Sequence, residues 1–280
     1  MIPPEFDYAA PGSVDEAIGL LAQHGDEAKL IAGGHSLLPL MKLRFAAPSL
    51  LVDLKNVPGL SDVEGGNGAG LRMGARTRHV QIQEGSYGLL TEAAKQIADQ
   101  QVRNRGTIGG SLAHGDPAGD LPTVFLAMDG TVTARGPGGE RTIAAADLFQ
   151  DYLTTAVADD EVLTGVEFPS YEGYGHAYLK FTRRAEDWAM VGVAALVKVQ
   201  DGAFADVRVG LTHMGTTPLR ATAVEQALTG QLADASRIAS AAEAAAEGTS
   251  PPGDLNATPD YKRHLARVIV RRAITQAAGL

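Results

Sequence analysis

The sequence predicts an α+β fold built from two units, residues 1–174 and residues 175–280. Near the N-terminus, an amphipathic helical pattern is followed at once by a short apolar strand pattern. From Gly175 onward the residue pattern changes, first to Val- and Ala-rich strand patterns and then to Ala-rich helical patterns. A length of 280 residues is enough for about two domains at roughly 150 residues each.

The first elements predict a small α/β unit. In the stretch SVDEAIGLLAQHG, Ser13 and Glu16 form a capping-box pattern, and Gly25 is placed to end the helix. Residues 29–32 and 49–54 are apolar runs of strand length, and a Gly-Gly pair follows the first of them. These elements together predict one compact subdomain.

The first unit therefore divides into subdomains of about 1–55 and 56–174. Periodicity and turn residues predict the elements of the second subdomain. They are helices at 77–83 and 88–99, strands separated by a polar turn within 123–136, a short helix at 143–149 and a strand at 161–169.

The C-terminal unit is expected to hold an antiparallel sheet and helices. The turn signal at Asp201 lies between Val- and Ala-rich strand patterns, as in a hairpin. Residues 236–248 and 260–279 predict helices, joined by the loop TSPPGDLNATP.

Composition excludes several classes of function. The chain has 24 basic and 33 acidic residues and a net charge of −9, which disfavours sequence-independent nucleic-acid binding. It has no cysteine, so it cannot supply thiolate ligands to zinc or iron–sulfur clusters, and redox chemistry would need an organic cofactor. No apolar run reaches the roughly 18–20 residues of a membrane span. The start MIPPEFDYAAPGS lacks a signal-peptide pattern, which predicts a cytoplasmic location.

Two Gly-rich stretches carry the functional signal, IAGGHSLLPLMKLR from Ile31 and RNRGTIGGSLAHGDPAGDLP from Arg103. The nucleophile elbow G-x-S-x-G would need a Gly at Leu38, and no Asp–His pair is identifiable, which disfavours serine hydrolysis. The chain contains no G-x-x-x-x-G-K-[ST], and GGNGAG does not satisfy G-x-G-x-x-G, which disfavours P-loop and Rossmann sites.

Anion binding fits both stretches better. The glycine pairs at 33–34 and 109–110 let the backbone approach a ligand closely and adopt positive φ. A serine follows each pair, Ser36 and Ser111, and each pair precedes a segment that can begin a helix or tight turn. Two converging loops of this kind would hold a diphosphate without Lys or Arg. For either pair alone, a plain tight connection remains an alternative.

The motifs Ala32-Gly-Gly-His-Ser36 and Thr107-Ile-Gly-Gly110 resemble the two FAD-pyrophosphate motifs of the medium subunit of molybdenum hydroxylases, the xanthine oxidase family. The closest resemblance is to the medium subunits of aerobic carbon monoxide dehydrogenases, and it extends over nearly the whole chain. The order and spacing of FDYAAPGSVDEAIGLLAQHG, LAHGDPAGDLP, EVLTGVEFP and YLKFTRRAEDWAMVGVAA support it.

The resemblance implies an FAD-binding portion of the vanillyl-alcohol-oxidase (PCMH) type in two subdomains, followed by a carbon monoxide dehydrogenase flavoprotein-type C-terminal domain. It further implies a dimer of heterotrimers with a large molybdenum-cofactor subunit and a small subunit carrying two [2Fe-2S] clusters. Electrons would then leave through FAD to a quinone or another acceptor. Such an acceptor would bring the chain to the inner face of the membrane without any span of its own.

The resemblance also assigns site residues by position. Residues around the first motif would wrap the diphosphate and the near edge of the isoalloxazine, and residues of the second would hold the other side of the diphosphate. Apolar walls and two charged groups near the flavin complete the implied set. The implied FAD-binding residues are Leu30, Ile31, Ala32, Gly33, Gly34, His35, Ser36, Leu37, Ile97, Thr107, Ile108, Gly109, Gly110, Ser111, Asp120, Leu163 and Lys180.

Each implied role has a structural alternative. Asp120 would equally suit a turn before Leu-Pro, and Ile97 and Leu163 are ordinary core residues by pattern. Lys180, implied to stabilise a negative charge on the reduced flavin, would otherwise be a solvated strand lysine.

Other residues of the motif segments are also candidates for a role at the site. Trp188 either stacks by the flavin or packs in the core, and Arg183-Arg184 would face a partner subunit or a carboxylate. His35 and His114 lack a third ligand at metal-binding spacing, so we expect no metal site and no catalytic side chain.

Two other hypotheses remain at this stage. A stand-alone flavin oxidoreductase would bind its own substrate, but the C-terminal residues show no paired titratable groups of the kind a substrate site uses. A non-catalytic nucleotide-binding module would bind without colour. Other molybdenum hydroxylases, acting on N-heterocycles, nicotine, purines or aromatic acyl thioesters, are alternatives within the family.

Overall fold

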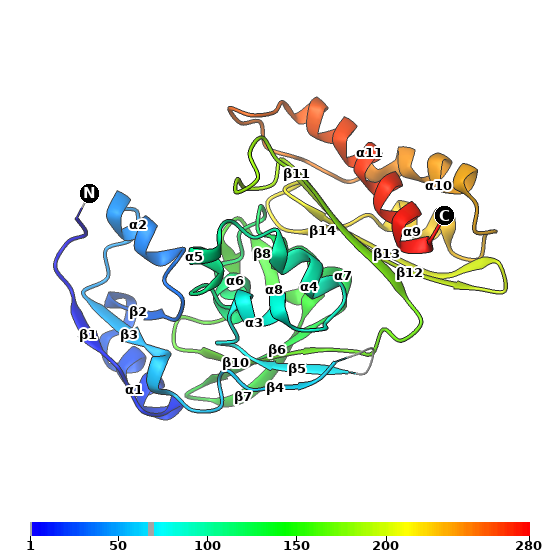
Figure 1. Ribbon diagram of the computed structural model, residues 1–280. Helices are drawn as coiled ribbons and strands as arrows, with labels where there is room; N and C mark the ends of the chain where they lie inside the picture. The colour runs from blue at the N-terminus through cyan, green and yellow to red at the C-terminus, as the bar shows by residue number, and fades with distance from the viewer. Residues whose placement is uncertain (1, 67–69) are drawn as a thin grey trace.

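The computed structural model describes residues 2–66 and 70–280. It shows the α+β architecture that the sequence predicts, and this architecture contains three principal sheets (Figure 1). The sheets change between residues 53 and 63 and again between residues 168 and 175. Within the described ranges, no helix combines the length and the apolar character that crossing a bilayer requires.

The N-terminal unit is a three-stranded parallel sheet in the order β1-β3-β2, with α1 packed against it. Its elements are β1 (Asp7–Ala9), α1 (Val14–His24), η1 (Gly25–Glu27), β2 (Ala28–Ile31), α2 (Leu37–Leu43), β3 (Leu50–Asp53) and η2 (Leu54–Asn56). Ser13 Oγ accepts from the Glu16 amide at 3.1 Å, as the capping pattern predicts. The Glu16 carboxylate, however, accepts from the Gly12 amide instead of closing the box on Ser13.

The middle unit is a five-stranded sheet in the order β4-β5-β10-β6-β7, with helices packed on one face (Figure 1). Its strands are β4 (Val63–Gly65), β5 (Leu71–Gly74), β6 (Thr131–Gly136), β7 (Gly139–Ala144) and β10 (Val162–Phe168), and a separate pair is formed by β8 (Phe149–Asp151) and β9 (Thr154–Thr155). Its helices are α3 (His79–Glu84), α4 (Leu89–Lys95), α5 (Gln100–Arg103), α6 (Ile108–His114), α7 (Asp120–Ala127) and α8 (Ala145–Leu148).

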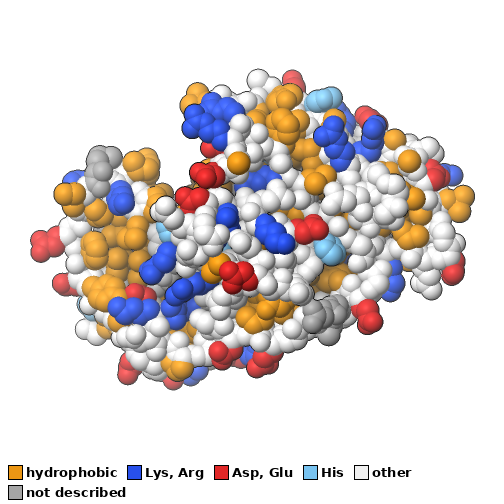
Figure 2. Space-filling view, in the orientation of Figure 1, with side chains coloured by type: hydrophobic (Ala, Val, Ile, Leu, Met, Phe, Trp, Pro, Cys, Tyr) orange, Lys and Arg blue, Asp and Glu red, His pale blue; other side chains and the backbone are white. Residues whose placement is uncertain are grey.

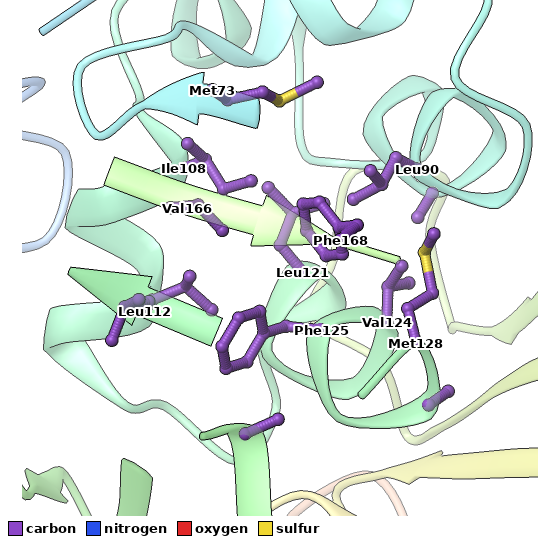
Figure 3. Packing of buried hydrophobic residues seen from close by; sticks show 14 of the residues in the cluster. Met73, Leu90, Ile108, Leu112, Leu121, Val124, Phe125, Met128, Val166 and Phe168 are labelled. Carbon is purple, nitrogen blue, oxygen red and sulfur yellow. The ribbon is translucent and has the colours of Figure 1, made fainter. Parts of the chain in front are cut away.

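The core of this unit lies between the sheet and helix α7 (Figure 3). Phe125 of α7 packs edge-to-face on Phe168 of β10, with ring centroids 6.0 Å apart. The strand predicted at the start of 123–136 is wrong, because residues 120–127 are helical and only 131–136 form a strand. The helix is buried on nearly all sides, so its continuous apolar run carries no helical periodicity and looks like a buried strand.

The C-terminal unit is a four-stranded antiparallel sheet in the order β11-β12-β13-β14, with three α-helices on one face (Figure 1). Its elements are β11 (Gly175–Phe181), β12 (Val191–Gln200), β13 (Ala203–Thr212), β14 (Leu219–Arg220), α9 (Thr222–Leu228), α10 (Ala235–Ala242), η3 (Glu243–Ala246) and α11 (Pro259–Ala278). The predicted hairpin is present: Asp201 and Gly202 have φ of 51° and 75° between β12 and β13.

Helix α7 joins the middle and C-terminal units, because it also packs on β12 and β13. A Cβ at Gly210 of β13 would lie 2.8 Å from the Thr123 carbonyl oxygen, so the helix backbone rests directly on the strand. Thr212 Oγ1 donates to Thr123 Oγ1 at 2.8 Å in the same interface. This contact joins the C-terminal sheet to helix α7 of the middle unit.

Candidate functional site

A cavity of about 900 Å³ lies where residues of all three units meet, a size typical of small-molecule and cofactor sites. Figure 2 shows the molecule hollowed between the N-terminal unit and the end of the β11–β12 hairpin. Every residue in the implied FAD set except Ile108 lines this cavity. Ile108 instead lies in the core beside Met73 and Val166 (Figure 3).

The first Gly-rich loop, between β2 and α2, offers backbone donors to the cavity. Gly34 has φ of 77°, in the left-handed region that favours glycine. The amides of residues 33–37 donate to no other residue in the described ranges, while the following amide, of Leu38, returns to the Gly34 carbonyl at 3.0 Å. Successive free amides beside a left-handed residue form an anion-binding concavity. The loop therefore has the donors that a diphosphate needs.

The second Gly-rich loop is built differently. Its amides are used within the protein: Ile108 donates to the Thr77 carbonyl, Gly109 to the Ala75 carbonyl and Gly110 to Thr107 Oγ1. The expectation of positive φ is wrong for residues 109–110, which lie in the first turn of α6.

Close packing explains glycines in both loops. A Cβ at Gly109 would lie 2.6 Å from the Ala75 carbonyl oxygen, and one at Gly33 would overlap the carbonyl of Arg105. Gly33 thus keeps the first loop in contact with the segment that leads into the second. The second loop offers hydroxyl groups to a ligand in place of free amides.

Ser111 is paired with a buried histidine. Its Oγ lies 3.3 Å from Nε2 of His79, and Nδ1 of His79 has no partner in the described part of the chain. Burial lowers the pKa of His79 to about 4, helped by the neighbouring His35 and Arg103, so the His79 imidazole is neutral at pH 7. A nucleophilic serine would need an acid that orients the histidine, and none is bonded here. Ser111 is accordingly a hydrogen-bonding group and not an activated nucleophile.

Asp120 and Lys180 form a buried ion pair at the cavity wall. Lys180 Nζ donates to Asp120 Oδ2 at 3.0 Å, and both side chains are only 4 % exposed. The solvated alternative for Lys180 is therefore wrong, and Asp120 is the first residue of α7 rather than a turn residue. Burial raises the pKa of the Asp120 carboxyl, and the Lys180 ammonium and the Tyr178 hydroxyl oppose that shift.

Two residues support this pair that the sequence reading did not single out. Tyr178, two residues before Lys180 on β11, donates from its hydroxyl to Asp120 Oδ1 at 2.6 Å. Gln96 accepts from Lys180 Nζ through its backbone carbonyl at 3.0 Å, and its side-chain amide donates to the Tyr178 carbonyl. The alternating positions 178 and 180 on one strand are the signal that would have linked Tyr178 to the site.

Some of the remaining candidate residues line the cavity and others lie outside it. Trp188 lines the cavity and is 62 % exposed, so core packing is wrong for it. His35 and His114 also line the cavity. Arg183 and Arg184 lie outside it, exposed, at the end of the β11–β12 hairpin. Missed lining residues include Arg76, whose Nη1 donates to the Lys55 carbonyl at 3.0 Å.

These features fit FAD. The free amides of the first loop match a diphosphate, since backbone donors bind phosphate oxygens without a fixed positive charge. Apolar side chains such as Ile97 and Leu163 offer surfaces for flat rings, and Lys180 offers a cation beside them. When bound, FAD supplies the capacity to take up two electrons, and the chain supplies binding, orientation and electrostatics.

Comparison with known proteins agrees with this site. Residues 4–171 match the family "FAD binding domain in molybdopterin dehydrogenase", and residues 176–277 match "CO dehydrogenase flavoprotein C-terminal domain". The carbon monoxide dehydrogenase medium chain of Hydrogenophaga pseudoflava is 40 % identical over 99 % of this chain and 98 % of its own. The alpha subunit of the 6-hydroxypseudooxynicotine dehydrogenase complex of Paenarthrobacter nicotinovorans is 38 % identical over 99 % of this chain and 96 % of its own.

A solved structure gives the same result. Carbon monoxide dehydrogenase from Hydrogenophaga pseudoflava, in a form lacking the Mo-pyranopterin moiety, contains a chain that superposes with a TM-score of 0.95 at 42 % identity. The superposition covers 99 % of this chain and 98 % of that one. Fold and sequence thus agree over 99 % of the chain, which belongs to the family of FAD-binding medium subunits of molybdopterin dehydrogenases.

Proposed function

We propose that this chain is the FAD-carrying electron-transfer subunit of a three-subunit molybdenum hydroxylase of the carbon monoxide dehydrogenase type. It receives electrons from [2Fe-2S] clusters of a small partner subunit and passes them through FAD to a quinone or another acceptor. Substrate oxidation takes place at the molybdenum cofactor of a large partner subunit. The observation that carries this proposal is the end-to-end similarity to a chain named as the medium chain of such an enzyme.

The residues of the chain support this division of labour. The chain has no cysteine, so clusters must be held by a partner. In the cavity, the amides of residues 33–37 would bind the diphosphate, and Ser111 and Thr107 would add hydroxyl donors on the other side. The pair Lys180–Asp120 would hold a positive charge against the flavin ring where negative charge develops on reduction.

The substrate is the finer part of the proposal. Carbon monoxide is favoured by the 40 % identity to the Hydrogenophaga medium chain, but the pseudooxynicotine relative follows at 38 %. Because the substrate would meet only the large subunit, the similar identities of these two medium chains to this one do not separate their substrates. Other molybdenum hydroxylase substrates are therefore the outcomes against which carbon monoxide is tested.

Co-purification and anaerobic reduction test the proposal. The chain expressed alone should carry FAD without iron or molybdenum, and both metals should appear only in a complex with two further chains. Adding carbon monoxide to that complex without oxygen should bleach the flavin absorption bands. Bleaching by an N-heterocycle but not by carbon monoxide would reassign the substrate. Turnover of an organic substrate by the isolated chain would contradict the electron-transfer role.

A further inference from the structure

His213, at the end of β13, is held in an unusual backbone conformation. Its φ is 63°, in the left-handed region that is costly for a residue with a side chain. The surrounding structure fixes it there from both sides. The His213 amide donates to the Pro117 carbonyl at 2.8 Å, and its ring Nδ1 lies 2.7 Å from the Ala189 carbonyl oxygen.

The hydrogen-bond partners define the ring's tautomer. A carbonyl can only accept, so Nδ1 carries the proton and donates to Ala189. Nζ of Lys262 lies 3.3 Å from Nε2 and 3.5 Å from Nδ1 of the ring, so the ammonium is placed over the ring face and not in line with either nitrogen. Lys262 is fully buried on α11 and donates to Asp254 Oδ2 at 2.7 Å. The three side chains form the cluster Asp254–Lys262–His213, in which Asp254 holds the ammonium against the ring.

The hydrogen bonds of His213 reach two segments that line the cavity. Pro117 lies between Asp116 and Gly119, which line the cavity and lead into Asp120. Ala189 directly follows Asp187 and Trp188, which line the cavity from the β11–β12 hairpin. One residue thus ties a loop of the middle unit to a loop of the C-terminal unit on the same wall.

We propose that His213 is a positioning residue for the FAD site, with Lys262 and Asp254 holding its ring, and that it sets the place of the 186–189 segment against the cavity. This inference deepens the proposed function, since it assigns a support to the same site. A histidine suits the task because its Nδ1 donates to the Ala189 carbonyl while the face of its ring packs against the Lys262 ammonium. The buried Lys262 then has a use, since an ammonium ion in the interior must be paired and hydrogen-bonded.

Trp188 provides a direct readout, because it is the only tryptophan of the chain. In the flavin-free full chain, fluorescence anisotropy decay and iodide quenching of Trp188 report how firmly the segment is held. The first variant is His213→Gly, which accepts positive φ but removes the ring. His213→Asn is the conservative variant, because Asn tolerates the left-handed region and its side-chain amide can donate to Ala189. Asp201→Gly is the matched control, a left-handed residue in the β12–β13 turn, far from the cavity.

The expected result is greater Trp188 mobility and iodide access in His213→Gly, together with an FAD dissociation constant about tenfold higher, as loss of one positioning hydrogen bond implies. His213→Asn should restore most of both signals, and Asp201→Gly should match the wild type in both. Lys262→Met, which removes the ammonium from the face of the His213 ring, should give a smaller change in the same direction. This variant decides the matter if His213→Gly does not fold.

The proposal is overturned if the glycine and asparagine variants behave alike, or if Trp188 and the FAD dissociation constant are unchanged in His213→Gly and Lys262→Met. A control variant that loosens Trp188 equally would also overturn it. If the wild-type chain bound no FAD, the proposed function would fail, but the Trp188 measurements on the flavin-free chain would still decide whether His213 positions the segment.

Discussion

Replacing Lys180 by methionine isolates the buried ion pair at the cavity wall. Both partners are 4 % exposed, so the substitution leaves the Asp120 carboxylate in the interior without its cation. Removing one member of a buried pair costs about 3–5 kcal/mol. The Tyr178 hydroxyl still donates to Asp120 at 2.6 Å, which places the expected loss at the lower end, about 3 kcal/mol at neutral pH.

The loss should depend on pH in a defined direction. Without the ammonium, burial raises the pKa of the Asp120 carboxyl further above its value in the unfolded chain. The folded state then binds the proton more tightly than the unfolded state, so stability increases as the pH falls through the folded pKa. The deficit of Lys180→Met should be largest at neutral and alkaline pH and should shrink on acidification.

Thermal unfolding of the flavin-free chain measures this effect. At about 2–4 °C per kcal/mol for a chain of this size, the midpoint should fall by roughly 6–12 °C. The matched control is Lys29→Met, whose partner Asp159 is 2.8 Å away but whose side chains are 45 % and 77 % exposed. Such an exposed pair contributes at most about 1 kcal/mol.

A second comparison separates the unpaired charge from lost packing. The double variant Asp120→Asn with Lys180→Met has no charge left at this buried pair and should recover part of the stability lost in the single variant. A loss of stability in Lys180→Met no larger than that in Lys29→Met would refute the cost assigned to an unpaired Asp120 carboxylate. A loss of stability that is the same at neutral and acidic pH would refute it as well.

Three further substitutions test other parts of the site. Because burial lowers the pKa of His79 to about 4 from an unfolded value of about 6.5, wild-type stability should fall by about 3 kcal/mol as the pH drops through that interval. In urea unfolding, the stability of His79→Gln should fall less steeply at acidic pH than that of the wild type. An equally steep fall would contradict a buried, neutral His79. Gly109→Ala should destabilise the flavin-free chain by about 1–3 kcal/mol, because its Cβ would lie 2.6 Å from the Ala75 carbonyl oxygen; an unchanged unfolding midpoint would show that this contact is not tight. Gly34→Ala, in the left-handed region, should cost about 1–2 kcal/mol and weaken FAD binding, measured by flavin fluorescence; unchanged affinity would remove the first loop from the diphosphate site.

Much of the fold follows from local signals in the sequence. The Ser13 cap, the Asp201–Gly202 hairpin and the periodicity of α11 depend on neighbours in the chain, and each is present in the structure. The sequence pattern predicts a strand where helix α7 lies. The helix is buried between two sheets, so its apolar residues show no helical periodicity.

At the candidate site, too, local motifs are visible in the sequence, but contacts between distant residues are not. Residues of the two Gly-rich motifs line one cavity, as the sequence led us to expect, but the sequence did not reveal why glycines stand there. Glycine is needed at positions 33 and 109 because the backbone there lies against Arg105 and Ala75, respectively. Both contacts are between residues that are far apart in the sequence. The pair of Asp120 with Lys180 bridges 60 positions of sequence, so no spacing rule relates its members. Their separate identification came from the family resemblance.

The most direct test of the proposed flavin site is a titration of the flavin-free wild-type chain with FAD while the emission of Trp188 is followed. Trp188 is the only tryptophan and lines the same cavity as the free amides of residues 33–37. One FAD per chain should bind and quench that emission in step with the change in flavin fluorescence. Stoichiometric FAD binding that leaves Trp188 emission unchanged would place the flavin elsewhere and contradict the site described here.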